Sequence, residues 1–195
     1  MHTLTITRTV YTFDELRELG GKAYEKARDL VSQWATPDSH ILSDYLLEEL
    51  RNIAGSDCEI SDYRISYAQG DGVNIRADIT LSDAPTPSVG PKFPVLEGVE
   101  HIRVTPYDRR YLGSCCDVSI TWTDMQAELI ADMTSQDEYA VTARVEDAVG
   151  EWYRDVCAHL YAFARADIEY WWNEDNIAEY ARDSGYEFYE DGSPL

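Results

Sequence analysis

Residues 65–79 read ISYAQGDGVNIRADI, two runs of partly alternating apolar and polar side chains on either side of a Gln-Gly-Asp-Gly turn. Glycine at two of the four turn positions supplies the positive φ angles that a tight reversal needs, so the stretch predicts a β-hairpin. Turn chemistry alone explains these glycines. A second interpretation is that the bare backbone, together with Gln69 and Asp71, forms a recognition tip.

The length and composition of the chain favour a single domain over residues 1–195. A chain of 195 residues is long enough to bury a core without disulfide or metal cross-links. Its 44% hydrophobic and 12% aromatic residues are typical of a globular protein and not of a disordered acidic tail.

The net charge is the most unusual property of the sequence. Sixteen Lys and Arg face 37 Asp and Glu, which gives a formal charge of −21. A field of this sign repels nucleic acid and anionic membranes and favours basic partners or cations. We therefore expect no direct binding to nucleic acid or to a membrane. One interpretation is that the negative charge only keeps the protein soluble. The other is that the acidic residues form a surface that competes with nucleic acid for a basic groove on a partner.

The cysteines and the N-terminus point to a reducing cytoplasm. No CxxC or HxxxH spacing occurs, so the sequence predicts neither a metal site nor a bound cofactor. No signal-peptide pattern opens the chain, and no apolar run approaches the length of a membrane span. The four cysteines are Cys58, Cys115, Cys116 and Cys157.

The first third of the chain predicts a strand and two helices. Thr12 and Glu15 form a capping-box pattern at a helix start, and the Gly20-Gly21 pair predicts a kink or break within that helix. Gly55 is expected to end the second helix. The predicted elements are a strand at 2–11, a helix at 13–35 and a helix from about 39 to 54.

The rest of the chain predicts strands followed by a long helix. Residues 123–133 fit either a helix or an extension of the preceding strand. After the hairpin at 58–81 we expect an exposed Pro-rich loop at 82–94, strands at 99–105, 117–123 and 186–189, and helices at 142–172 and 173–181. The long helix carries an apolar stripe formed by Val145, Val149, Trp152, Val156, Leu160 and Phe163. The pattern predicts an α+β domain in which three to four helices cover an antiparallel sheet of about five to six strands.

Two small groups of residues suggest chemistry. Cys115 and His101 lie on neighbouring predicted strands and are the one candidate pair for nucleophilic catalysis, but a small buried Cys and a surface His are the simpler explanation. Arg103, Arg109 and Arg110 could bind a phosphate, or could neutralise neighbouring carboxylates. We assign no catalytic residue and expect a protein that is not an enzyme.

The charge of the C-terminal segment is more informative. From residue 167 onward nine acidic residues face one arginine and are interleaved with aromatic residues. Acid mixed with Trp and Tyr could imitate the phosphates and bases of nucleic acid, or could be a solvated helix face whose aromatics belong to the core. On the first interpretation the predicted partner-binding residues are Asp167, Glu169, Trp171, Trp172, Glu174, Asp175, Glu179 and Asp183, with Gln69 and Asp71 from the hairpin tip.

Three separated motifs resemble a loosely defined family of small acidic phage and prophage accessory proteins. They are VYTFDEL at 10–16, YAQGDG at 67–72 and YEFYEDG at 186–192, and they occur in the family's order. The family resemblance implies a phage accessory product of unassigned activity, and such proteins often inhibit host defences by binding.

These observations lead to three hypotheses. The first is a phage-encoded inhibitor of a nucleic-acid-targeting defence of the CRISPR or restriction type, which binds a host or defence protein with a basic groove. The second is an antitoxin or regulatory module that neutralises a basic toxin. The third is a small nucleotide-directed enzyme that uses Gln69, Asp71 and the arginine cluster.

Overall fold

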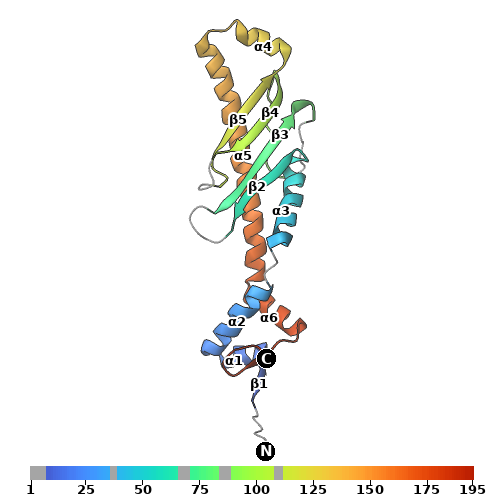
Figure 1. Cartoon of the computed structure of the whole chain (residues 1–195), viewed down its shortest axis with the longest axis vertical. Coiled ribbons are helices and arrows are strands. Elements are labelled where there is room, and N and C mark those ends of the chain that lie inside the picture. The colour runs from blue at the N-terminus through green and yellow to red at the C-terminus, as the bar shows by residue number, and fades with distance from the viewer. Residues whose placement is uncertain (1–7, 36–38, 66–70, 84–88, 108–111) are drawn as a thin grey trace, which may run out of the picture. The chain divides into compact units, whose positions relative to one another are not determined.

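The computed structural model describes residues 8–35, 39–65, 71–83, 89–107 and 112–195, which form a mixed α and β structure with antiparallel sheets (Figure 1). The predicted α+β class is confirmed. The described residues contain six strands, as expected, but these form sheets of four and two strands. They contain six α-helices, more than predicted, because a glycine pair divides the first helix and residues 124–131 fold as a helix.

Contacts along the chain define two compact units, each described here by itself. The first, which we call the terminal unit, consists of Met1–Ser39 and Ala166–Leu195. The second, the central unit, consists of His40–Arg165. The expectation of one domain over residues 1–195 stays a prediction, because a division by contacts does not test whether either unit folds alone.

The terminal unit joins the two ends of the chain. Its core side chains are Phe13, Leu16, Ala27, Val31, Ile177, Ala178, Ala181 and Phe188. Strands β1 and β6 pair antiparallel, with Val10 opposite Tyr189. The elements are β1 (Val10–Thr12), α1 (Phe13–Leu19), α2 (Gly21–Ala35), α6 (Glu174–Asp183) and β6 (Glu187–Tyr189).

Local sequence signals explain how this unit begins. The Glu15 amide donates to the Thr12 hydroxyl at 3.3 Å, and the Thr12 amide donates to the Glu15 carboxylate at 2.7 Å. This is the predicted capping box. Gly20 and Gly21 adopt φ angles of +67° and +75°, which only glycine takes without strain. The chain therefore ends α1 and starts α2 at this pair.

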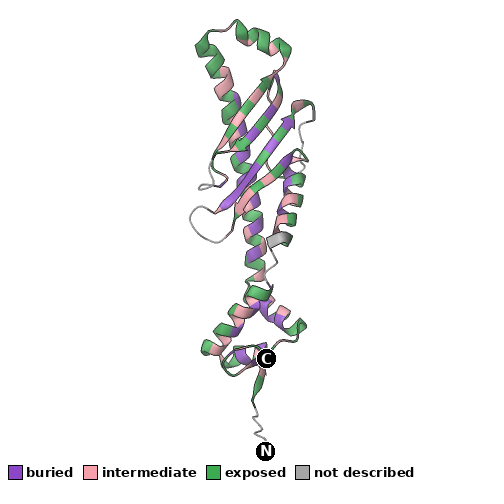
Figure 2. Ribbon diagram, in the orientation of Figure 1, coloured by how far each residue is buried: buried purple, intermediate pink, exposed green. Residues whose placement is uncertain are grey.

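The central unit is a four-stranded antiparallel sheet with helices on one face (Figures 1 and 2). Its strands follow the order β2-β3-β4-β5, so each pairs with its neighbour in sequence. Buried side chains of α3 and α5 pack against the apolar side of the sheet. The elements are α3 (Ser39–Ala54), β2 (Cys58–Arg64), β3 (Gly72–Thr80), the short 3-10 helix η1 (Leu81–Asp83), β4 (Val99–Pro106), β5 (Cys116–Trp122), α4 (Asp124–Ala131) and α5 (Ser135–Trp171), whose residues from Ala166 onward belong to the terminal unit.

Helix α5 supplies the predicted apolar stripe with one exception. Five of its six members are buried, but Phe163 remains 38% exposed. Ala164 and Ile168 are buried instead, because they continue the spacing of four residues from Leu160. The prediction that Phe163 belongs to the buried stripe was therefore wrong, because the next residue, Ala164, takes that place.

The Pro-rich segment is partly packed against this core. Residues 84–88 lie outside the described residues, and Val89 is 66% exposed, as a surface loop should be. Phe93, however, is half-buried and its ring lies 4.9 Å from that of Trp152 in an edge-on contact. The second half of the segment is therefore a strap over the core and not a fully exposed loop.

A buried amide fixes the connection between β4 and β5. Asn74 is 3% exposed, and its Oδ1 accepts from the Gly113 amide at 2.6 Å and from the Tyr153 hydroxyl at 3.1 Å. A Cβ at Gly113 would lie 2.8 Å from the Cys157 Cβ, so the backbone passes too close to α5 for any other residue. Asn74 thus ties β3, α5 and this connection together.

Candidate functional site

Helix α6 carries four of the predicted partner-binding carboxylates, all of them exposed: Glu174, Asp175, Glu179 and Asp183. Its inner face buries Ile177, Ala178 and Ala181 against the core of the terminal unit. The Asn173 side chain caps the helix by accepting from the Asp175 amide at 3.0 Å. With 3.6 residues per turn, Glu179 and Asp183 fall on the face opposite the buried one, whereas Glu174 precedes Ile177 and Ala178 by one turn on the inner side.

The first two carboxylates attach α6 to α1 and α2. Arg17 lies 3.2 Å from the Asp175 Oδ1 and 3.8 Å from the Glu174 Oε1. The Tyr24 hydroxyl donates to Glu174, and burial together with this hydrogen bond raises the pKa of Tyr24 to about 12. Sequence patterns gave no signal for this link, since Arg17 and Asp175 are 158 residues apart. Glu174 and Asp175 therefore have a structural role whether or not they bind a partner.

Glu179 and Asp183 are the two carboxylates of α6 that remain available to bind a partner. Both are exposed, and neither forms an ion pair with a described residue. They are four residues apart and so lie one turn apart on the same side of the helix. Two uncompensated negative charges at this spacing repel each other slightly, and a cationic partner would relieve that repulsion.

The end of α5 adds aromatic surface to the same unit. Tyr170 and Trp172 are 56% and 50% exposed, whereas Trp171 is half-buried with its ring 5.3 Å from that of Tyr170. Trp172 and Glu174 line one hollow of about 450 Å³, together with Arg28 of α2. Exposed aromatic rings beside charged groups are common anchors in protein interfaces.

The other two residues of this segment differ in exposure. Glu169 is exposed, while Asp167 is half-buried. The Oδ2 atom of Asp167 is buried and has no hydrogen-bond partner among the described residues, and burial raises the pKa of this carboxyl group. The structure therefore brings all eight predicted residues of the 167–183 segment into the terminal unit, with Asp167 the least suited to contact a partner.

The two hairpin residues belong to the central unit. Gln69 lies outside the described residues, and Asp71 is half-buried immediately before β3. The described part of the hairpin pairs β2 with β3 in an antiparallel register, with Ile60 opposite Ile75. The hairpin prediction is confirmed for the strands, and the recognition tip stays a prediction.

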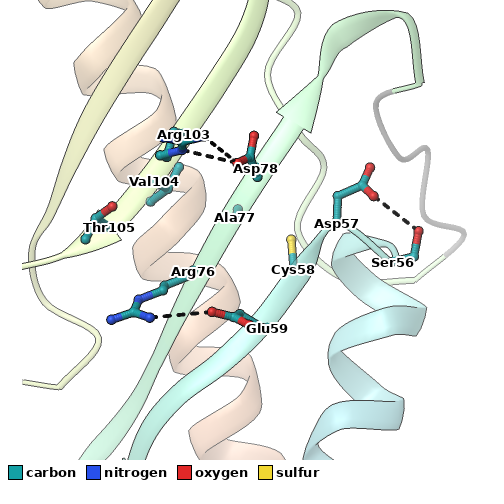
Figure 3. A pocket seen from close by; sticks show the side chains of 10 residues that line it. All are labelled: Ser56, Asp57, Cys58, Glu59, Arg76, Ala77, Asp78, Arg103, Val104 and Thr105. Carbon is teal, nitrogen blue, oxygen red and sulfur yellow. Dashed lines mark hydrogen bonds and ion pairs between the residues drawn. The ribbon is translucent and has the colours of Figure 1, made fainter.

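The open face of the central sheet carries a second hollow, of about 420 Å³, which is lined by three carboxylates and two arginines (Figure 3). Arg103 donates to the Asp78 Oδ2 from Nη2 at 2.9 Å and from Nε at 3.1 Å, and His101 contacts the other oxygen of Asp78. Arg103 and then His101 lower the pKa of Asp78. Across the next strand pair, Arg76 lies 3.6 Å from the Glu59 carboxylate.

These pairs leave little free positive charge for a ligand. Arg103 neutralises a neighbouring carboxylate, which was one of the two interpretations of the arginine cluster. Arg109 and Arg110 lie outside the described residues, so the cluster as a whole stays a prediction. Figure 3 shows that both ion pairs run between adjacent strands, as expected for a solvated antiparallel sheet face.

Cys115 and His101 do not form a catalytic pair. Cys115 directly precedes Cys116, which is opposite Pro106, whereas His101 is opposite Thr121, so Cys115 lies six residue steps along the chain from the residue that His101 faces. At ~3.4 Å per residue this is a distance of roughly 20 Å along the strand. The hypothesis of a nucleophile and base at these residues was therefore wrong, because the register of β4 and β5 could not be read from the sequence.

Two further findings concern the described residues. They contain no group of three or more His, Cys, Asp or Glu side chains placed to hold a metal ion. None of the helices in the described ranges has the length and apolar character needed to cross a membrane.

Comparison of the chain with protein-family models, with curated proteins and with solved structures finds no match.

Proposed function

We propose that this protein is a phage-encoded inhibitor of a bacterial nucleic-acid-targeting defence, of the CRISPR or restriction type, and that it acts in the host cytoplasm by binding. The observation that carries the proposal is the outer face of α6, where Glu179 and Asp183 are exposed without an ion-pair partner among the described residues. Trp172, half-exposed at the end of α5, belongs to the same unit.

The charge of the terminal unit supports a basic partner. This unit holds 15 acidic and six basic residues, and part of the basic set is already paired with α6 or the C-terminal turn. An acidic surface of this kind accelerates association with a positively charged groove and suppresses binding to nucleic acid itself. The interaction should weaken as salt shortens the Debye length, which is about 8 Å at physiological ionic strength.

The residues on the open face of the sheet favour binding to a protein over binding to nucleic acid. Its exposed positions on β4 and β5 are polar or charged, and they include Arg103, Thr105, Asp117, Ser119 and Thr121. Proteins that bind single strands on a sheet place aromatic rings there for base stacking. No aromatic residue occupies the fully exposed positions of these two strands.

Co-purification at two salt concentrations tests this proposal. The tagged full chain is expressed in bacteria that carry CRISPR or restriction systems, and bound proteins are identified by mass spectrometry at low and high salt. We expect a nuclease or another defence effector that is retained at low salt and lost at high salt. A salt-sensitive toxin in its place would favour the antitoxin hypothesis, and absence of any basic partner would contradict both.

Matched variants make the test specific for α6. Glu179→Lys with Asp183→Lys reverses two exposed charges four residues apart and leaves the Arg17 pairs intact. The control, Asp44→Lys with Glu48→Lys, makes the same change at the same spacing on α3 of the central unit. We expect the first variant to lose the partner and the control to keep it. Equal retention by both variants would contradict a role for α6.

A further inference from the structure

Helix α4 has an unusual property: it buries none of its side chains. Met125 and Leu129, one turn apart on its surface, are 71% and 53% exposed. The helix has only eight residues, and isolated helices of this length are marginal in water. Figure 2 shows α4 and the first turns of α5 as the largest mainly exposed helical part of the central unit.

The cap of α4 accounts for where this helix begins. The Thr123 side chain accepts from the Gln126 amide at 3.4 Å, and its hydroxyl donates to the Gly98 carbonyl oxygen at 3.3 Å. A Cβ at Gly98 would lie 2.7 Å from the Gln126 side chain. These contacts hold the first turn of α4 beside the 95–98 segment and leave Met125 and Leu129 exposed.

A hollow of about 570 Å³ opens beside this helix within the central unit. Its apolar lining comes from three elements: Val95 and Leu96 before β4, Trp122 at the end of β5, and Val141 of α5. Val95 is 93% exposed, so its side chain contributes almost nothing to the core. The hollow combines these apolar side chains with the polar groups of Glu97, Gln126 and Arg144. Exposed apolar side chains gathered beside such a hollow favour an interaction surface, because contiguous apolar patches on monomeric proteins often mark binding sites.

The surroundings of this patch are strongly acidic. Between residues 124 and 143 the chain has five carboxylates and no basic residue, and Glu97 lies on the rim of the hollow. None of these carboxylates forms an ion pair with a described residue. Arg144 is the basic side chain that lines the hollow. The five carboxylates are Asp124, Glu128, Asp132, Asp137 and Glu138.

We propose that α4 and the adjoining hollow form a docking site for a basic amphipathic helix of a partner protein. The apolar face of such a helix would contact Val95, Met125 and Leu129, and its basic side chains would face the acidic rim. A second copy of this chain is disfavoured as the occupant because it would bring the same negative charge. The site is separate in sequence from the α6 surface and goes beyond the proposed function.

Two peptides of identical composition test this site. One, of about 18 residues, places Leu at i, i+3, i+4 and i+7 and Lys elsewhere, and the other permutes these residues so that no apolar face forms. Binding of each fluorescein-labelled peptide to the full chain is measured by fluorescence anisotropy at ~0.15 M salt. We expect the amphipathic peptide to bind at least about tenfold more tightly than the permuted one.

A double substitution separates apolar docking from charge attraction. Val95→Asp with Met125→Asp adds two negative charges while removing two exposed apolar contacts, so docking should weaken by about tenfold although charge attraction rises. Both side chains are mainly exposed, and the melting temperature should stay close to that of the native chain. The control, Ile41→Asp with Tyr45→Asp on α3, changes two other exposed apolar residues four positions apart and should bind like the native chain.

Three results would overturn the proposal. The first would be that the permuted peptide bound as tightly as the amphipathic one. The second would be that the Val95→Asp, Met125→Asp variant bound the amphipathic peptide as tightly as the native chain does. In the third, analytical ultracentrifugation shows a dimer of the native chain that this variant abolishes, which would make a second copy the occupant.

Discussion

Replacing Asn74 should destabilise the central unit far more than its size suggests. In Asn74→Ala, two donors lose their acceptor: the Gly113 amide at 2.6 Å and the Tyr153 hydroxyl at 3.1 Å. Tyr153 is fully buried, so water cannot replace the lost partner there. An unsatisfied buried donor costs about 1–3 kcal/mol, so two of them predict a loss of roughly 2–6 kcal/mol in the free energy of unfolding. This is a large part of the ~5–15 kcal/mol that stabilises a typical domain.

Urea unfolding followed by circular dichroism measures this loss. Tyr153→Phe removes one donor and leaves the Gly113 bond to Asn74, so it should cost only about 1 kcal/mol. Ser119→Ala, on the exposed face of β5, should stay within ~0.5 kcal/mol of the native chain. A cost for Asn74→Ala no greater than that of Tyr153→Phe would refute the role given to this amide.

Two further predictions concern titrating groups. Iodoacetamide should alkylate the exposed Cys115 in the native chain, whereas Cys58 and Cys157 should react only after unfolding. The reason is that burial raises the pKa of both thiols to about 12. Mass spectrometry of the peptides identifies the alkylated cysteines. A carbon-13 NMR titration should give Asp191 a pKa of about 2, because the Ser193 hydroxyl and amide donate hydrogen bonds to its carboxylate. The substitution Ser193→Ala should raise the pKa of Asp191 toward the usual 3.8. Since this pKa is lowered in the folded chain, the stabilisation from Asp191 is complete above pH 4 and is lost as the pH falls through about 2.

Local elements of the fold were predictable because their signals are local. The Thr12–Glu15 capping box, the break at Gly20-Gly21 and the end of α3 before Gly55 all occur where the sequence predicted them. Each depends on a side-chain cap or a positive φ angle within a few residues. The same applies to the β2–β3 hairpin, whose strands follow from short-range alternation.

Features that depend on distant parts of the chain were not predictable. The pairing of β1 with β6 joins residues about as far apart in sequence as the chain allows, and three-residue strands carry no periodic pattern. Asn74 reads as an ordinary polar position of a strand, and its burial arises because the Gly113 backbone packs beside it. Strand register is fixed by tertiary packing, which is why the sequence could not show that Cys115 and His101 lie far apart.

The candidate surface was predictable in composition but not in its ion pairs. The acid and aromatic residues of the 167–183 segment were identified from the sequence, and the amphipathic pattern of α6 places Glu179 and Asp183 opposite its buried face. The sequence did not indicate that Arg17 holds Glu174 and Asp175, because a pattern of charges does not specify which of many carboxylates an arginine contacts. The structure therefore directs mutagenesis to Glu179 and Asp183.

An inhibitor of a phage defence should change the plating efficiency of a phage on bacteria that carry a defence system against it. We expect expression of the native chain to restore plaque formation against at least one CRISPR or restriction system. Glu179→Lys with Asp183→Lys should abolish this effect, while Asp44→Lys with Glu48→Lys, at exposed positions of α3, should retain it. Full restoration of plaques by the α6 variant, at equal expression, would show that the acidic face of α6 does not carry the inhibition.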